Sequence, residues 1–135
     1  MTHEEKVKFI DDLYAATERG DWDTANAMLT DDLVITEAAG LPMEGTYKGR
    51  NALHDLFMDV FTSLDVSGLD RAAVTTGGDY AICIVTMHFA GEDLEPAELC
   101  EMFRFRDGKC CEIKPYYFDP APLRAAAAAK ASASA

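Results

Sequence analysis

The chain changes its hydrophobic period once, near residue 65, and this change limits the folds open to it. Up to residue 64 the clearest apolar patterns recur at helical spacing, whereas from residue 66 onward strand-length runs follow one another. These runs cover residues 66–76, 80–90, 97–106 and 109–118. Helices first and a meander of strands afterwards predict an α+β fold, in which helices cover one face of an antiparallel sheet.

The first part of the chain predicts two helices that follow one another closely. Residues 3–19 place apolar side chains at helical spacing, and Thr2 with Glu5 fits a capping box at the start. Gly20 ends this helix, and Asp21 can cap a second, short one.

A strand and a long helix are predicted next. Residues 33–38 form a short strand, and the segment 39–49 is predicted to be a loop because it holds three glycines and a proline. The helix predicted over residues 50–64 has the most regular apolar face in the chain.

The length of 135 residues suits one domain, which we place at residues 1–119. The tail, residues 120–135, is rich in alanine, and Asp119 followed by Pro120 is a helix-start signal. It has no large apolar face, so it is either a helix or a frayed extension.

The charge of the chain argues against two classes of partner. Twenty-four acidic and twelve basic residues give a net charge of −12. That charge repels phosphate backbones and anionic membrane surfaces, so we expect neither a nucleic acid nor a membrane as partner.

Cysteine and histidine positions give no sign of a metal site. The four cysteines, at 83, 100, 110 and 111, form no C-x-x-C pair, and the vicinal pair is expected to point to opposite faces of a strand. We interpret them as reduced structural cysteines of a cytoplasmic protein. No phosphate-binding loop or nucleotide fingerprint is present, so no cofactor is expected.

Three motifs resemble those of SnoaL-like and ketosteroid isomerase-like proteins of the nuclear transport factor 2-like (NTF2-like) superfamily. They are ERGDWDTANAMLTDDLVIT, GTYKGRNALHDLF and ELCEMFRFRDGKCCEIKPYYFDP, within a resemblance that runs from residue 5 to about 119. The resemblance implies a strongly bent sheet that wraps around the N-terminal helices and encloses a cone-shaped pocket. It also implies a homodimer formed through the opposite sheet face.

The resemblance to ketosteroid isomerases also implies catalytic positions. Their base lies six positions after the first residue of an Asp-Asp pair, which here is Glu37, after Asp31. Their oxyanion acid lies two residues before a Phe-Arg-Phe, which here is Glu101. Their oxyanion tyrosine falls at Leu13, with Tyr14 roughly 100° further around the helix, so the alignment predicts an oxyanion hole without its tyrosine.

Two carboxyls in an apolar pocket suit proton transfer next to a carbonyl group. Burial raises a carboxyl's pKa toward the working pH of a base, and a carboxyl kept neutral can donate a hydrogen bond to a developing enolate oxygen. The alternatives are that Glu37 is a solvated strand-end residue and that Glu101 pairs with a basic side chain such as Arg50, Arg71 or Lys114.

A third catalytic candidate is His88, which shares a strand face with Ile82, Ile84 and Thr86. The resemblance places it near the mouth of the cone, as an acid–base partner, while the alternative is a strand-end histidine half in solvent. The candidate substrate-binding residues are aromatic: Tyr14, Trp22, Tyr47, Phe57, Phe61, Phe103 and Tyr117. For the wall aromatics, ordinary core packing is the alternative.

Two functions follow from these candidates. One is a cofactor-independent acid–base enzyme, an isomerase or a polyketide cyclase-like lyase, that acts on a small hydrophobic carbonyl compound. The other is a non-catalytic module of the same fold that binds a ligand or a protein.

Overall fold

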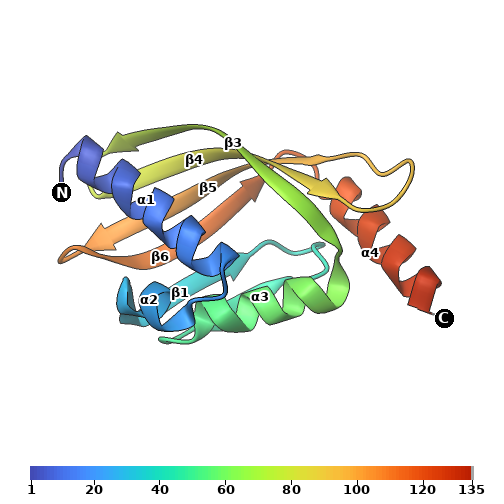
Figure 1. Cartoon of the computed structure of the whole chain (residues 1–135), viewed down its shortest axis with the longest axis horizontal. Coiled ribbons are helices and arrows are strands. Elements are labelled where there is room, and N and C mark those ends of the chain that lie inside the picture. Colours follow the sequence, from blue (N-terminus) through green and yellow to red (C-terminus); the bar gives the residue numbers. More distant parts are fainter. Residues whose placement is uncertain (135) are drawn as a thin grey trace.

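The structure is a computed structural model that describes residues 1–134. It contains helices at both ends of the chain and a six-stranded sheet between them (Figure 1). In chain order the elements are α1 (His3–Glu18), α2 (Trp22–Ala27), β1 (Leu29–Glu37), β2 (Gly45–Lys48), α3 (Ala52–Ser63), β3 (Val66–Gly77), β4 (Tyr80–Phe89), β5 (Ala97–Arg106), β6 (Lys109–Tyr117) and α4 (Ala121–Ser134). The α+β class and the four predicted strands of the second half are confirmed.

The sheet is mixed rather than antiparallel throughout. Its strand order is β2-β1-β6-β5-β4-β3, and β1 runs parallel to β6 while the other neighbours are antiparallel. The meander β3 to β6 is antiparallel, as predicted from its short turns. The parallel pair joins strands far apart in sequence, which no local pattern can specify.

One strand was missing from the prediction. Residues 45–48, assigned to a loop, form β2, which pairs with β1 from Val34 opposite Lys48 to Glu37 opposite Gly45. The strand is short and lies between glycines, so it shows no alternation of its own. The strand β1 also begins at Leu29, earlier than predicted.

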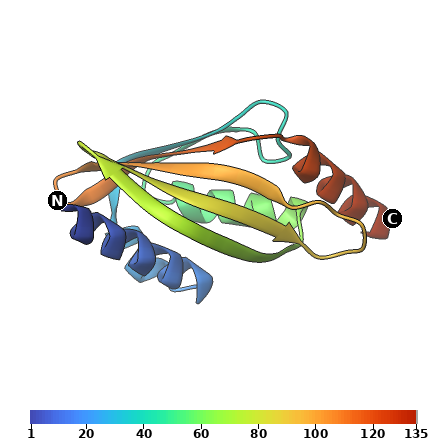
Figure 2. The same ribbon diagram turned by 90° about the horizontal axis from the view of Figure 1, so that it is seen from above.

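The sheet is bent, and the helices α1 to α3 lie within its curve (Figure 2). Register shifts interrupt β3 between Val66 and Gly68 and between Arg71 and Ala73. Such bulges increase local twist and bend a strand. The strand β3 runs along α1, with His3 bonded to Thr76 at one end and Tyr14 under Arg71 further along.

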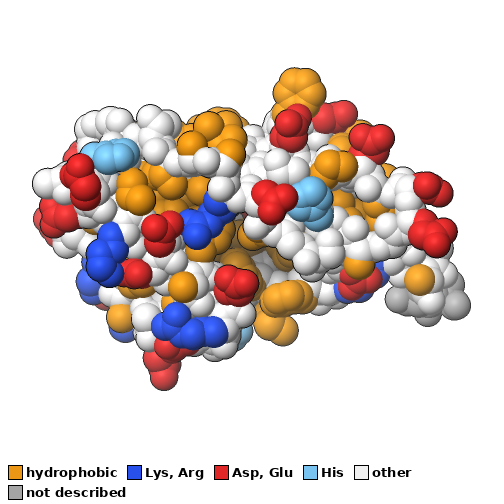
Figure 3. All heavy atoms as spheres, turned by 45° about the horizontal axis from the view of Figure 1, so that its top comes forward, with side chains coloured by type: hydrophobic (Ala, Val, Ile, Leu, Met, Phe, Trp, Pro, Cys, Tyr) orange, Lys and Arg blue, Asp and Glu red, His pale blue; other side chains and the backbone are white. Residues whose placement is uncertain are grey.

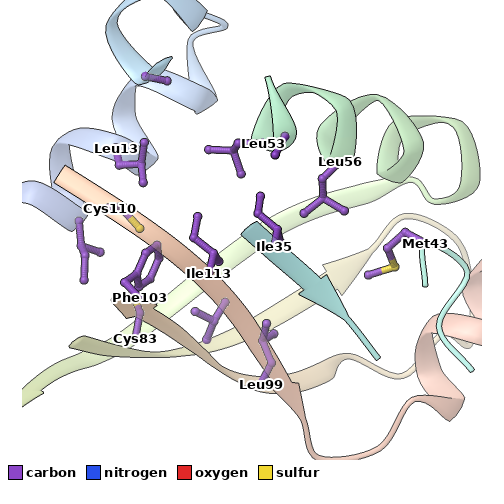
Figure 4. Close-up of a cluster of buried hydrophobic side chains, with 14 of the residues drawn as sticks. Leu13, Ile35, Met43, Leu53, Leu56, Cys83, Leu99, Phe103, Cys110 and Ile113 are labelled. Atoms are coloured by element: carbon purple, nitrogen blue, oxygen red, sulfur yellow. The ribbon is translucent and has the colours of Figure 1, made fainter. Parts of the chain in front are cut away.

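Apolar side chains from helices and strands meet in one core between these layers. Figure 4 shows Leu53 and Leu56 on α3 pointing toward Ile35 on β1 and Ile113 on β6. Leu13 of α1 is 3% exposed and belongs to the same cluster. The core therefore fixes α1 and α3 against the sheet and sets the shape of the remaining space.

The vicinal cysteines do not follow plain strand alternation. Cys110 pairs with Phe105 and Glu112 with Arg104, so Cys111 is the extra residue of a bulge. Both thiols are buried, and the four cysteines form no disulfide in the described part of the chain.

The alanine-rich tail forms the helix α4, which packs at the C-terminal end of α3. Leu123 is fully buried, and Lys130 Nζ donates to the carbonyl oxygens of Phe61 and Leu64. The same ammonium group lies 3.0 Å from Asp65 Oδ1. The tail thus supplies a cation at the negative end of the α3 dipole.

Candidate functional site

A cavity of about 360 Å³ lies between the helices and the bent sheet. This volume is within the range of small-molecule sites. Most of the cavity wall is apolar: Met43, Leu53, Leu56, Phe57, Val60, Phe61, Val66, Leu69, Met87, Ile113 and Pro115. Figure 3 shows hydrophobic side chains in and around a hollow on one face of the molecule, with acidic side chains spaced around it.

Glu37 and Glu101 both line this cavity, on either side of the central strand β6. Glu101 on β5 is paired with Pro115 on β6. On the other side, Ile35 pairs with Ile113, and two more residues along the parallel register bring Glu37 beside Pro115. The two acids therefore lie at one level of the sheet, with backbones about 10 Å apart, since neighbouring strands are about 4.8 Å apart.

Glu37 is a buried acid without a partner. Glu37 is the last residue of β1 and is 5% exposed. Its Oε1 atom has no hydrogen bond within the described residues. Burial, and then the negative charge of Glu101, raise the pKa of Glu37 to about 8. The alternative of a solvated strand-end residue is wrong.

Glu101 also titrates above the usual range of a carboxyl. Burial raises its pKa to about 7, and the Tyr14 hydroxyl opposes this shift. The residue keeps some accessible surface, which opens onto the cavity that it lines.

None of the basic residues considered as partners of Glu101 pairs with it. The ion pairs of Arg50, Arg71 and Lys114 are instead with Asp31, Asp11 and Glu112, respectively. The alternative of a structural ion pair at Glu101 is therefore wrong.

Tyr14 lines the cavity next to Glu101, although the alignment placed Leu13 at the tyrosine position. Its hydroxyl has no hydrogen bond of normal geometry in the described residues, but it lies close enough to affect the pKa of Glu101. Burial, and then the charge of Glu101, raise the pKa of Tyr14. Leu13 is 3% exposed and belongs to the core, so Tyr14, a predicted substrate-binding residue, is the residue of this pair that lines the cavity.

Arg71 on β3 is a cavity residue that the sequence did not identify as one. Its guanidinium carbon lies 4.6 Å from the centre of the Tyr14 ring, and Nη1 donates to Asp11 Oδ1 at 2.8 Å. Alternation along β3 puts Arg71 on the face of Leu69, which also lines the cavity. The bulge after Arg71 hides this pattern in the sequence.

His88 lies outside the cavity, contrary to the prediction. Its Nε2 lies 2.7 Å from Asp70 Oδ2, and its side chain is 44% exposed. It does share a face with Ile82, Ile84 and Thr86. That face is the outer one, because the buried residues of β4 all lie on the other face: Ala81, Cys83, Val85 and Phe89.

The predicted aromatic wall is partly present. Tyr14, Phe57, Phe61 and Tyr117 line the cavity, whereas Trp22, Tyr47 and Phe103 do not. Trp22 stacks on His54 with ring centres 4.5 Å apart. The Tyr47 hydroxyl donates to Asp59 Oδ2 at 2.6 Å, and Phe103 is buried in the core with its ring 6.4 Å from that of Tyr14.

The described residues contain neither a cluster of metal-ligand side chains nor a membrane-spanning helix. Within residues 1–134, no cluster of three or more His, Cys, Asp or Glu side chains could hold a metal ion. No helix in that part of the chain has the length and apolar character needed to cross a membrane.

Comparison with known proteins identifies the family. The model of the SnoaL-like domain matches residues 10–113, which is most of the chain. Among curated protein sequences, none matches this chain.

Solved structures share the fold at low sequence identity. An NTF2-like protein from Burkholderia xenovorans is 21% identical, with 94% of this chain and 98% of that chain covered and a TM-score of 0.76. A protein of unknown function from Burkholderia pseudomallei is 16% identical, with the same coverage and TM-score. TerC, co-crystallised with polyporic acid, is also 16% identical, with 92% of this chain and 98% of that chain covered and a TM-score of 0.77. By its sequence this chain belongs to the SnoaL-like domain family, and it has the NTF2-like fold.

Proposed function

We propose that this protein is a cofactor-independent acid–base enzyme that moves a proton next to the carbonyl group of a small hydrophobic compound. The observation that carries the proposal is Glu37, an acid that is 5% exposed, has an unpartnered oxygen and lines an apolar cavity. A buried polar atom without a partner costs stability. A substrate that supplies the missing interaction explains why such an atom is kept.

Glu37 is the base in this proposal. Its free Oε1 can accept a proton from a carbon beside the carbonyl group, and a pKa of about 8 suits a base that works near neutral pH. The apolar walls exclude water, which keeps the carboxylate reactive.

Glu101 and Tyr14 are the proposed hydrogen-bond donors to the substrate's carbonyl oxygen. Burial raises the pKa of both carboxyls, to about 8 for Glu37 and about 7 for Glu101, so the ligand-free pair has a form that holds one shared proton near neutral pH. A carbonyl oxygen placed against Glu101 favours its protonated form, because only that form can donate. Substrate binding therefore shifts the proton to Glu101 and leaves Glu37 free to act as base.

This arrangement fits an isomerase or a cyclase, since both begin with an enolate. The proton removed by Glu37 returns at another carbon in an isomerisation, whereas in a cyclisation the enolate carbon attacks a second carbonyl group. TerC, which shares this fold, was co-crystallised with polyporic acid, and a small organic ligand on this fold supports a small-molecule substrate for this chain.

Deuterium exchange tests the proposal without knowledge of the natural substrate. Beta-tetralone and related cyclic ketones would be incubated with the protein in heavy water, and loss of the proton signal beside the carbonyl group followed by NMR. We expect Glu37→Gln to slow the catalysed exchange by roughly 10²–10⁴-fold, the usual contribution of a positioned base.

The matched control is Glu98→Gln, which changes an exposed acid on β5, the strand of Glu101. It should exchange at the wild-type rate. If Glu37→Gln exchanged as fast as wild type, the proposed base would be wrong. Ligand binding without exchange on any ketone would instead favour a non-catalytic binding module.

A further inference from the structure

The cavity contains one cationic side chain, and its surroundings suggest a role in choosing the ligand. Among the described residues that line the cavity, Arg71 is the only lysine or arginine, whereas Glu18, Glu37 and Glu101 are acids. The whole chain carries a net charge of −12, so its general field repels anions. An anion would therefore enter this cavity only where a local cation receives it.

The guanidinium group of Arg71 has N–H donors beyond the one that binds Asp11. Its one hydrogen bond to the described residues is from Nη1 to Asp11 Oδ1, and Arg carries five N–H donors in a planar fork. Asp11 is itself half-exposed, with a side-chain exposure of 55%. The ion pair with Asp11 thus holds the guanidinium in place without using up its hydrogen-bonding capacity.

The position of Arg71 relative to the two acids is set by Tyr14. The guanidinium lies over the Tyr14 ring, at 4.6 Å, while the hydroxyl of the same ring lies beside Glu101. One aromatic ring therefore separates a cation from the proposed carbonyl-binding point. A ligand that reached both would carry its anionic group a few bonds away from its ketone.

We infer that Arg71 forms an anion subsite, so that the protein selects ketones that also carry a carboxylate or a similar anionic group. A guanidinium binds a carboxylate by two parallel hydrogen bonds and keeps its charge at all working pH values. This inference rests on the proposed function for the placement of the ketone, but the binding preference can be measured without catalysis.

The competing explanation is that Arg71 only ties β3 to α1 through Asp11 and Tyr14. Two variants separate these roles. Arg71→Met removes the charge and keeps an unbranched side chain, whereas Asp11→Asn weakens the same tie but leaves the guanidinium in the cavity. A third variant, Arg71→Lys, keeps a cation without the planar fork.

The probes are benzoylpropionate, a ketone with a carboxylate a few bonds away, and its primary amide, which has nearly the same shape and no charge. Larger aryl analogues of the same pair extend the test to ligands that fill more of the cavity. Dissociation constants would be measured by calorimetry, with thermal unfolding as the check that each variant is folded.

We expect the wild-type protein to bind a carboxylate at least tenfold more tightly than its amide. Arg71→Met should abolish this preference with little change for the amide, Asp11→Asn should retain it, and Arg71→Lys should retain part of it. The amide should still undergo deuterium exchange, since its ketone is unchanged.

Three results would overturn the inference. They are equal binding of carboxylate and amide by wild type, equal losses of carboxylate binding in Arg71→Met and Asp11→Asn, or no binding of any carboxylate in the series. A preserved preference for carboxylates without deuterium exchange would contradict the proposed catalysis and leave the anion subsite in place.

Discussion

Glu37 and Glu101 interact electrostatically in the largely apolar cavity that both line, and this interaction is the source of the proposed chemistry. Each carboxyl is costly to ionise because of burial, and the charge of Glu101 makes ionisation of Glu37 more costly still. The pair therefore passes through a form with one proton and one charge. In that form one carboxyl can act as base and the other as acid, with apparent pKa values that belong to the pair.

The raised pKa of Glu37 predicts a pH-dependent stability. The folded state holds this proton up to about pH 8, whereas the unfolded chain releases it near pH 4.5, so the stabilising contribution is lost as pH rises toward and through 8. We expect Glu37→Gln to gain stability relative to wild type between pH 5 and pH 9, by roughly 2–4 kcal/mol. Urea unfolding at several pH values measures this difference.

The control for this experiment is Glu98→Gln, whose difference from wild type should not change with pH. A difference between Glu37→Gln and wild type that stayed constant from pH 5 to pH 9 would mean that Glu37 ionises at an ordinary pH.

Tyr14 is predicted to contribute through its hydroxyl alone. Tyr14→Phe keeps the ring under Arg71 but removes the donor beside Glu101, and loss of one such donor typically costs about 10²-fold in rate. We expect this loss in ketone exchange with ligand affinity changed much less. Tyr116→Phe, at an exposed tyrosine, is the matched change. Equal rates in Tyr14→Phe and wild type would remove Tyr14 from the mechanism.

Sequence patterns predicted the helices and strands that are determined by residues close together in the chain, such as caps and turns. The helix over residues 3–18 has its capping box, with Thr2 Oγ1 accepting from Glu5 N, and the four strands after residue 65 have their short turns. The strand β2 was missed because its place is fixed by pairing with β1, which sequence spacing does not report.

The candidate site was predictable only in part, for the same reason. The motifs identified Glu37 and Glu101 as candidates. Their position at the same level of the sheet, on either side of Pro115, depends on the parallel register of β1 and β6. His88 was placed on the wrong face because alternation groups residues without saying which group points inward. The alignment put the oxyanion tyrosine position at Leu13, and only packing shows that Leu13 belongs to the core while Tyr14 lines the cavity.

The helix α4 is predicted to unfold together with the rest of the protein. Leu123 is fully buried, so Leu123→Ala leaves a cavity and should cost about 2–4 kcal/mol. Chemical denaturation of this variant and of Ser132→Ala, an exposed position on the same helix, measures the difference. If Leu123→Ala cost no more than Ser132→Ala, α4 would be an independent extension.

For the whole molecule, we propose a homodimer through the outer face of the sheet. Tyr80, Ile84 and Tyr116 are exposed there, at 43–54%, and clusters of exposed apolar residues mark interaction surfaces. Arg104 and Lys114 share Glu112 on the same strands, so this face lacks the excess negative charge of the chain as a whole.

The dimer predicts an effect of a charge placed in the middle of this face. Ile84→Lys should shift the mass measured by analytical ultracentrifugation from dimer to monomer, because two copies would bury like charges against one another. Thr62→Lys, a change at an exposed position on α3, should leave the mass unchanged. A monomeric wild-type protein at micromolar concentration would contradict the proposal.

The proposed mechanism depends on two carboxyls that hold protons near neutral pH inside one cavity. Carbon-13 NMR of protein labelled at the glutamate side-chain carboxyls, followed from pH 3 to pH 10, measures this directly, with Glu37→Gln and Glu101→Gln to assign the signals. We predict two signals that titrate near pH 7 and pH 8 and that shift when the other acid is replaced. If both carboxyls titrated near pH 4.5 and neither responded to loss of the other, the proposed mechanism would be wrong.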